Sequence, residues 1–460
     1  MNVIATRPTL TVIAACAIAA WASVAGAEPP VATPELLGGE LFTPLGAERG
    51  ANEAGTIPAW EGGITEPPPD YNPAYHETDP FPDDPVLYTI TADNLADYTE
   101  LLTEGQRALL EAYPDTWRMN VFRTRRTASY PDWVYAGVID NARSAELVTE
   151  GKGGVRNARI SSPFPIPSSG VQVIWNQNLR WRGTRVSRTT GRAAVTRKGR
   201  YNVVLTEVEM GFPYGVREPT AFTRRFPNLM IAYKFRTIQP SFLAGDGGLI
   251  IEPIDQTESP RKSWIYNRAL KRVIRTPTFG YSMPAPNSDG LRTIDEFELF
   301  NGAPDMFEWT LLGKREILIP YNAYRLHSSS LDYEDVLRIG HVAPDLVRFE
   351  LHRVWVVEGR LRDDQRHVYS RRVLYVDEDS WQVSLSDSYD LEGNLWRTAM
   401  AHGLNYYTVP VHLSTLDVHH DLVELRYFVD GLDNRRKPYV FTEGSDPREF
   451  SPNALSYYVR

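Results

Sequence analysis

Cysteine is almost absent from this chain of 460 residues, and long hydrophobic runs are confined to its beginning. Cys16 is the single cysteine, so a chain processed beyond this point can have no disulfide scaffold, thiol catalysis or cysteine-ligated zinc. After residue 27, no segment approaches the ~18 consecutive apolar residues of a membrane-spanning helix. Such a chain must be held by its core, and at this length roughly three quarters of the unfolded surface can be buried.

The first 27 residues have the composition of a cleavable secretion signal. Arg7 supplies the positive charge, Leu10–Val24 is an uncharged hydrophobic region, and Ala25 and Ala27 are small residues at the expected cleavage site. An alternative is a lipoprotein cleavage box that would acylate Cys16. The residues after Cys16 stay hydrophobic rather than opening a polar tether, which favours simple cleavage and secretion.

Motifs of catalysis, phosphate binding and metal binding are also missing. Gly245–Gly248 lacks the Lys-Ser/Thr that follows a P-loop, and neither a Gly-x-Ser-x-Gly nor a His-Glu-x-x-His sequence occurs. The tightest histidine cluster, His419 and His420, places adjacent side chains on opposite faces of a strand, where they cannot easily share a metal. We therefore expect no cofactor, no metal site and no enzymatic activity. A pair of glycosidase carboxylates cannot be recognised from sequence, so a hydrolase stays an alternative.

The formal net charge of −9 argues against general nucleic-acid binding. One basic island stands out, because no acidic residue occurs between Arg180 and Arg200. It could contact anionic lipid headgroups or an acidic partner, or it could be a solvated hairpin around Gly191. The candidate residues for such a partner or headgroup patch are Arg180, Arg182, Arg185 and Arg188.

Strand patterns dominate the chain after residue 117. Val347–Val357, His367–Val376 and Trp381–Ser386 follow one another with short polar turns, which predicts an antiparallel meander. Two short helices are expected before it, at Ala92–Leu102 and Thr103–Tyr113. The predicted fold class is mainly β, with one large curved antiparallel sheet or half-barrel and a few short helices.

Composition divides the chain into three regions: a signal peptide at 1–27, a proline-rich extended arm at 28–90, and a β-rich domain at 91–460. Proline lacks the amide that helix interiors and central strands require. Because the arm contains Phe42 and Trp60, we expect it to lie along the folded body. Within the domain, the odd positions of Leu229–Phe235 are consistently apolar, which predicts a strand with one buried face.

Aromatic side chains recur on or beside the predicted strands. They would be ordinary core residues, or they would line the concave face of a curved sheet and contact an apolar ligand. The candidate ligand-lining residues are Trp264, Tyr266, Trp355, Tyr369, Tyr375 and Trp381.

Several runs resemble a family of Gram-negative secreted proteins, the domain of unknown function 1329 family. The runs that carry the resemblance are spread over almost the whole chain and include Thr43–Glu48, Ile57–Gly63, Ala112–Arg118, Pro163–Pro167, Ser263–Asn267, Ser288–Thr293, Phe300–Asp305, Ile319–Tyr324 and Glu350–Glu358. Members are described as outer-membrane lipoprotein-sorting proteins and are similar in fold to the carriers LolA and LolB. That fold is an incomplete antiparallel barrel with an apolar concavity for acyl chains.

The resemblance implies a periplasmic protein, with an association with the outer membrane left open, that carries a hydrophobic molecule, a lipid or a lipoprotein acyl chain between membrane partners. Members of this family tend to be encoded beside large export pumps of the resistance-nodulation-division type and an outer-membrane β-barrel protein. The resemblance therefore implies these proteins as candidate partners. The alternatives are a non-carrier periplasmic adaptor of such a pump and a hydrolase of envelope lipid or glycan. The family offers no established catalytic residues to transfer to this chain.

Overall fold

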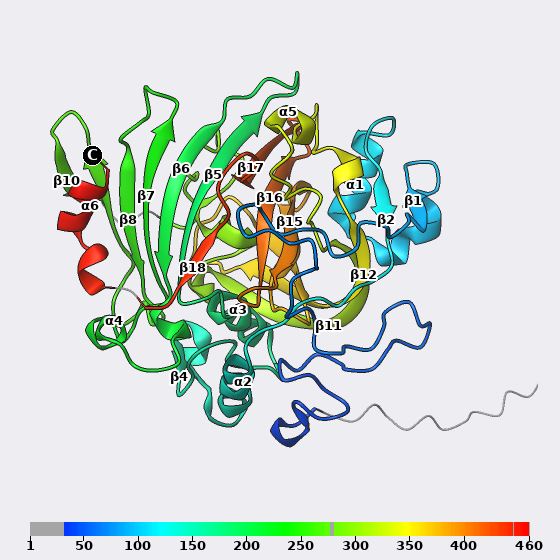
Figure 1. The fold of residues 1–460 in the computed structure, drawn as a ribbon, viewed down its shortest axis with the longest axis horizontal. Coiled ribbons are helices and arrows are strands. Elements are labelled where there is room, and N and C mark those ends of the chain that lie inside the picture. The colour runs from blue at the N-terminus through cyan, green and yellow to red at the C-terminus, as the bar shows by residue number, and fades with distance from the viewer. Residues whose placement is uncertain (1–31, 277–279, 445, 460) are drawn as a thin grey trace, which may run out of the picture.

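The protein is built around one sheet of 16 strands, seen in a computed structural model that describes residues 32–276, 280–444 and 446–459 (Figure 1). The predicted signal segment, residues 1–27, lies outside the described residues. The strands of the chain are β1 (Tyr88–Ile90), β2 (Met119–Val121), β3 (Glu146–Val148), β4 (Gly154–Arg156), β5 (Arg185–Val195), β6 (Val204–Gly211), β7 (Ile231–Gln239), β8 (Gly247–Glu252), β9 (Lys262–Asn267), β10 (Arg272–Arg275), β11 (Phe307–Pro320), β12 (Phe349–Leu361), β13 (Arg371–Asp377), β14 (Val383–Tyr389), β15 (Leu395–Tyr406), β16 (Val411–Asp421), β17 (Arg426–Leu432) and β18 (Val440–Thr442).

The strand order explains the shape of the molecule. Along the main path the order is β1-β2-β12-β13-β14-β15-β16-β17-β5-β6-β7-β8-β9-β10, with β11 beside β12 and β18 beside β5. Neighbouring strands are antiparallel except at the contact of β2 with β12. β3 and β4 form a separate small sheet. The fold is thus mainly β with one large curved sheet, as the sequence predicts.

Short helices cover parts of this sheet. The α-helices of the described residues are α1 (Glu104–Ala112), α2 (Asp132–Ser144), α3 (Gly170–Leu179), α4 (Ala221–Arg225), α5 (Tyr333–Val336) and α6 (Pro452–Tyr458). α1 packs on β14 and β15, α3 on β11 and β12, and α6 on β8, β9 and β10. In the part of the chain that the structure describes, every helix is too short or too polar to cross a membrane.

The predicted meander is confirmed as β12, β13 and β14. Val356 pairs with Tyr375, and Tyr375 pairs in turn with Leu385, so all three apolar side chains lie on one face of the sheet. This face packs into a core that also contains Leu109 and Leu110 of α1. The strands are therefore as predicted, but β14 is buried over its whole length, so both of its faces are covered and not only the apolar one.

The helical predictions are partly confirmed. The second predicted helix is α1, which begins with a capping box: Thr103 accepts from the amide of Gln106, and the Gln106 side chain accepts from the amide of Thr103. The first is shorter than predicted, a 3-10 helix at Leu95–Leu101. α2 and α3 are absent from the sequence-based prediction, which placed strands after residue 117.

Three strands differ most from the sequence-based expectation. β15 and β16 were not predicted, since they are buried along most of their length on both faces and carry many polar side chains, so hydrophobicity does not alternate. The hairpin considered around Gly191 is wrong. Gly191 lies in the middle of β5, where it pairs with Leu205, and a Cβ there would meet Val203 at 2.8 Å.

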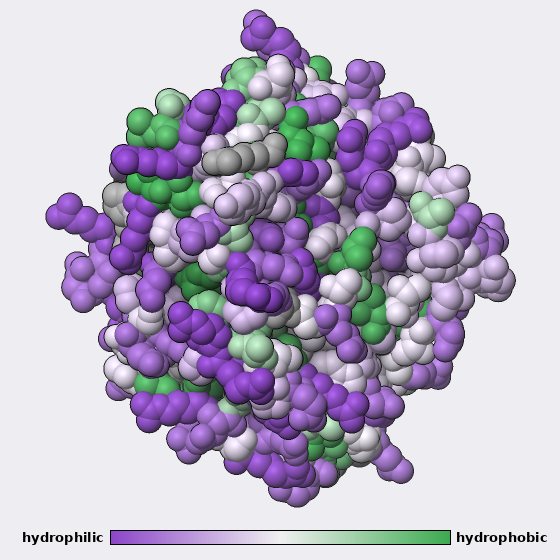
Figure 2. All heavy atoms as spheres, turned by 60° about the vertical axis from the view of Figure 1, so that its left-hand side comes forward, coloured by the Kyte–Doolittle hydropathy of each residue, from purple (hydrophilic) through white to green (hydrophobic). Residues whose placement is uncertain are grey.

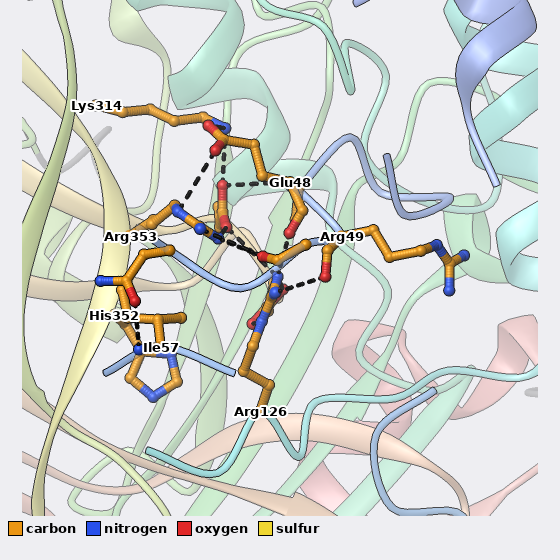
Figure 3. Close-up of polar contacts among 12 residues, drawn as sticks. Glu48, Arg49, Ile57, Arg126, Lys314, His352 and Arg353 are labelled. Atoms are coloured by element: carbon orange, nitrogen blue, oxygen red, sulfur yellow. Dashed lines mark hydrogen bonds and ion pairs between the residues drawn. The ribbon is translucent and has the colours of Figure 1, made fainter. Parts of the chain in front are cut away.

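The arm lies along the folded body, and its apolar residues Phe42, Ile57 and Trp60 are buried. Polar contacts hold it there as well. Figure 3 shows Glu48 near Lys314 and Arg353, at 3.0 and 3.5 Å, while Arg126 donates to the backbone oxygens of Glu48 and Arg49. Residues before β1 are therefore part of the packed structure.

A second contact ties the arm to the segments that follow β11 and β17. Glu77 of the arm lies 2.9 Å from Nε2 of His327, and Asp433 lies 2.7 Å from its Nδ1. His76 stacks on the same imidazole at 4.4 Å. Burial by itself would lower the pKa of His327, but the carboxylates of Asp433 and Glu77 outweigh burial and raise this pKa to about 10.

We predict that this contact makes stability fall at alkaline pH. An ordinary histidine has a pKa near 6.5, so the raised value means that His327 contributes fully below about pH 6.5 and loses its contribution as pH rises through about 10. Replacing His327 by Gln leaves two buried carboxylates without their cation and should cost about 3–5 kcal/mol at pH 7. Urea unfolding from pH 6 to pH 10.5 measures both effects. The prediction fails if the variant and the wild type lose stability in parallel over this range.

Candidate functional site

A small cavity lies between the inner face of strands β6 to β9 and residues 281–301; the inner face is the side of the sheet that this segment covers. The cavity has a volume of about 230 Å³. On β7, Ile231, Tyr233, Phe235 and Thr237 all line it. Lys234 between them points to the other side and pairs with Glu209 at 3.1 Å. The alternation read from the sequence is thus what forms this wall.

Neighbouring strands complete the wall. Ile250 of β8 and Ile265 of β9 add apolar surface, and Gly248 leaves room for the ring of Phe235, since a Cβ there would lie 2.6 Å from Cε1 of that ring. β8 pairs with both β7 and β9, which places these residues side by side. A row of apolar side chains from adjacent strands therefore faces one common space.

Residues 281–301 form the cover of the cavity. Pro284 and Thr293 make a β-bridge, which closes a loop over the sheet, and a 3-10 helix follows at Ile294–Leu299. Phe297 from this helix packs against Tyr233, with ring centroids 6.1 Å apart. The cover residues that line the cavity are Met283, Pro284, Ala285, Pro286, Asn287, Arg292, Ile294, Phe297 and Asn301.

Buried ion pairs fasten the cover to the sheet. Arg292 binds Asp430 of β17 at 2.7 Å, and the same carboxylate takes Arg192 of β5 at 2.8 Å. Asp295 binds Arg372 of β13 at 2.6 Å. These contacts reach both halves of the sheet, so they fix the position of the cover relative to the cavity wall.

Glu298 makes the last of these contacts, with Arg182 at 2.6 Å and Arg180 at 3.0 Å. Burial would raise the pKa of Glu298, but the two guanidinium groups outweigh burial and lower its pKa to about 2. In the same way Arg192 and Arg292 hold the pKa of Asp430 well below its usual range. The carboxylates are therefore ionised at neutral pH, and each buried charge has a partner.

Polar groups at the base of the cavity are also paired with one another. Arg261 binds Glu252, and its guanidinium lies 5.0 Å from the ring centre of Tyr281. Ser263 shares a hydrogen bond of 2.5 Å with Thr276. Because these polar groups bind one another, the surface of the cavity is mainly apolar.

The inner face is different beyond β5, where charged and polar side chains fill it. Arg397 pairs with Asp421 at 3.3 Å and donates to the hydroxyl of Tyr369 at 3.1 Å, and this hydroxyl donates to Glu296 of the cover at 3.2 Å. Burial lowers the pKa of the nearby His419 to about 4. The apolar cavity is therefore confined to the β6–β9 half of the sheet.

The aromatic residues singled out in the sequence are spread over different clusters. Trp264 and Tyr266 both pack in the cluster between the sheet and α6, and Trp264 also contributes to the lining of the cavity. Trp355 and Trp381 stack with centroids 6.1 Å apart and belong to a separate cluster. Tyr369 is buried under the cover, and Tyr375 packs on the face that holds α1. The structure does not bring these six residues together.

The four arginines of the basic island do not form a patch on the surface. Arg180 and Arg182 are buried at 3% exposure and bind Glu298. Arg185 pairs with Glu209 and Glu449, and Arg188 lies under the ring of Tyr439. Their partners lie far away in the sequence, which explains why the stretch looks unpaired when it is read alone.

Sequence reasoning missed the cover itself. Met283, Pro284, Ala285 and Pro286 give neither a helical nor a strand period, and no local signal places them over the sheet. The acidic residues of the following 3-10 helix are the partners of the buried arginines on the sheet, for example Glu298 with Arg182. These partners are far apart in the sequence, so their pairing is seen only in the folded structure.

Comparisons with known proteins give matches over most of the chain. A family model described as a protein of unknown function (DUF1329) matches residues 89–456. An uncharacterized protein of Pseudomonas aeruginosa is 38% identical over 418 residues, which is 91% of this chain and 91% of that protein.

Two solved structures are similar at a lower level. A DUF1329 family protein from Desulfovibrio piger aligns with a TM-score of 0.41 and 13% identity, over 60% of this chain and 92% of that chain. A LolA superfamily protein from Nitrosomonas europaea aligns with a TM-score of 0.37 and 11% identity, over 63% of this chain and 100% of that chain.

We predict that the ion pairs of Asp430 beneath the cover contribute much of the protein's free energy of unfolding. Replacing Asp430 by Asn leaves Arg192 and Arg292 buried without their carboxylate and should cost about 3–5 kcal/mol in urea unfolding at pH 7. The control is Asp289→Asn, which removes an exposed ion pair with Arg426 and should cost under about 1 kcal/mol. Equal losses in the two variants would contradict this role of Asp430.

Proposed function

Because the chain belongs to the DUF1329 family of proteins of unknown function, we propose that it is a periplasmic binding protein that carries an apolar molecule or the acyl end of a lipid in the cavity beneath residues 281–301. The proposal is based on one observation: an apolar cavity lies under a cover that buried ion pairs hold to the sheet. The secretion signal expected at residues 1–27 supports a periplasmic location.

The size of the cavity limits what it can hold. Ligand pockets usually enclose about 300–1,000 Å³, so a cavity of about 230 Å³ suits a short apolar molecule or one end of a longer chain. Each buried methylene contributes about 0.8 kcal/mol to binding. Burial of several methylenes therefore gives useful affinity without any polar recognition.

The open side of the cavity is marked by two exposed apolar residues. Met283 of the cover and Ile265 of β9 both line the cavity, and they are 43% and 42% exposed. An acyl chain would enter between them and leave its polar end at the surface. On the face shown in Figure 2, apolar residues form separate small patches among polar ones, which favours the interior as the apolar binding surface.

The polar groups around the cavity support binding rather than catalysis. Glu252 is held by Arg261, Ser263 by Thr276, and Arg192 by Asp430. A nucleophile or general base needs a side chain that is free to act on the ligand. The ion pairs and hydrogen bonds of these groups assign them a structural role instead.

An adaptor of an export pump is the second candidate, and the filled half of the sheet favours it. Paired polar side chains fill the inner face between β13 and β17, which fits a body that presents surfaces to partners. In that case the partners would be a pump of the resistance-nodulation-division type and an outer-membrane β-barrel protein. The same pair of partners would deliver and receive the ligand of a carrier.

We predict that filling the cavity weakens ligand binding. Ile250→Trp places a large ring in the cavity and should weaken binding of the fluorescent fatty acid 11-(dansylamino)undecanoic acid at least about tenfold, which corresponds to about 1.4 kcal/mol. Ile251→Trp is the matched control, because it changes the next residue of β8 on the opposite face and should alter affinity less than about twofold. Fluorescence titration of the delipidated proteins measures both.

Two results would contradict the carrier. If Ile250→Trp and Ile251→Trp bind the fatty acid equally well, then the ligand does not enter this cavity. If the wild type fails to bind it and also fails to bind a phospholipid in detergent-free exchange, the adaptor is favoured. Circular dichroism of each variant must match the wild type for the comparison to count.

A further inference from the structure

A buried group of one histidine and two carboxylates lies at the junction of the arm, β12 and β13, away from the residues that line the cavity. His352 is on β12, Asp377 ends β13, and Asp379 follows in the turn to β14. One ligand atom from each of them lies within 4.8 Å of the others, and all three residues are buried. Antiparallel pairing of β12 with β13 brings the histidine to the turn.

The histidine is oriented by a carboxylate behind it. Its Nε2 lies 3.2 Å from Glu350, and in the neutral tautomer that donates from Nε2 to this carboxylate, Nδ1 carries the lone pair. Nδ1 lies 3.9 Å from Oδ1 of Asp377. Glu350 is itself held by Arg348 and Asn322. A carboxylate that fixes a histidine through its other nitrogen is the usual support of a metal-binding imidazole.

Two buried oxygens at this place have no hydrogen-bond partner among the described residues. Asp377 accepts from the hydroxyl of Ser380 through Oδ2 at 2.6 Å, and its Oδ1, which faces His352, is unpartnered. The hydroxyl of Tyr321 is also unpartnered, and its ring stacks on His352 at 4.0 Å. Buried polar atoms rarely stay unsatisfied, so each of them needs an explanation.

The balance of charge also points to a missing cation. Arg126 binds Asp379 at 2.7 Å, while Lys314 binds Glu378 at 2.7 Å. Figure 3 shows these cationic side chains converging on the arm and on this turn. Asp377 is the carboxylate of the turn that makes no such contact with an arginine or lysine of the described chain. A buried carboxylate needs a counter-charge or a proton.

We propose that His352, Asp377 and Asp379 bind one divalent metal ion. The oxygens of Asp379 keep free lone pairs beside their bonds to Arg126, so Asp379 can serve as a ligand without losing that contact. One imidazole nitrogen and two carboxylate oxygens suit Zn²⁺ or Mn²⁺ better than Ca²⁺, which prefers oxygen ligands alone. The ion would neutralise Asp377 and lock the turn between β13 and β14 against the arm.

A proton is the competing occupant. Burial and the neighbouring Asp379 raise the pKa of Asp377, so a proton competes with a metal ion for this carboxyl. A proton satisfies one oxygen of Asp377 but gives no role to Nδ1 of His352 beyond a distant contact. A metal ion engages both. The two occupants differ in what elemental analysis detects.

The sequence-based expectation of no metal site rested on local spacing, and the ligands here are not local. His352 and Asp377 are separated along the chain by a strand, a turn and the returning strand. The other cluster of this kind, His76 with His327 and Asp433, already has all its ring nitrogens hydrogen-bonded. It therefore needs no ion.

The test uses the full secreted chain without an affinity tag. The protein is unfolded in guanidinium with EDTA and refolded with ZnCl₂, MnCl₂, MgCl₂ or no metal, then desalted and analysed by inductively coupled plasma mass spectrometry. We expect about one Zn²⁺ or Mn²⁺ per chain, no retained Mg²⁺, and a higher melting temperature for the metal-loaded form. Less than about a tenth of an ion per chain, with unchanged melting temperature, means a proton only and overturns the proposal.

Variants locate the ion. His352→Gln and Asp377→Asn should each reduce retained Zn²⁺ at least tenfold, while His402→Gln, which changes another buried histidine, should retain it. If a variant fails to fold, refolding the wild type with Co²⁺ decides instead. Visible d–d absorption of a four- or five-coordinate site supports the assignment, and an octahedral aquo-ion spectrum contradicts it. The fatty-acid titration is independent, so failure of one proposal leaves the other standing.

Discussion

Pairing of buried charge between residues 292–298 and the sheet is the constraint on which the rest of the structure depends. Arginines from β5, from β13 and from the segment before β5, together with Arg292 of the cover, meet carboxylates of the cover or of β17. The distances are between 2.6 and 3.0 Å. Taking such charges out of water costs several kcal/mol for each ion unless a partner is in place. These ion pairs therefore hold the cover in the observed position, with the apolar cavity beside it.

This arrangement gives the two halves of one sheet different tasks. Between β13 and β17, charged side chains and the cover fill the inner face, so this half acts as a rigid support. Between β6 and β9, apolar side chains face the cover without filling the space. A binding protein gains from this division, because the ligand then replaces no ion pair when it enters.

Much of the fold could be predicted from the sequence where patterns are local. An apolar run and the polar turns after it identified β12 and β13, alternation identified β14 and the wall strand β7, and Thr103 marked the start of α1. The rest depends on pairs that are far apart in the sequence. Arg182 and Glu298 look like two unrelated surface charges until the strands bring them together. His352 and Asp377 also gave no spacing signal, and polar burial hid β15 and β16.

The most direct test of the central claim is native mass spectrometry, combined with solvent extraction, of the protein purified from its own periplasm. The account predicts an added mass that disappears on extraction and that the extract identifies as an apolar molecule or a lipid. A protein that carries no added mass and takes up no fatty acid afterwards would contradict the account.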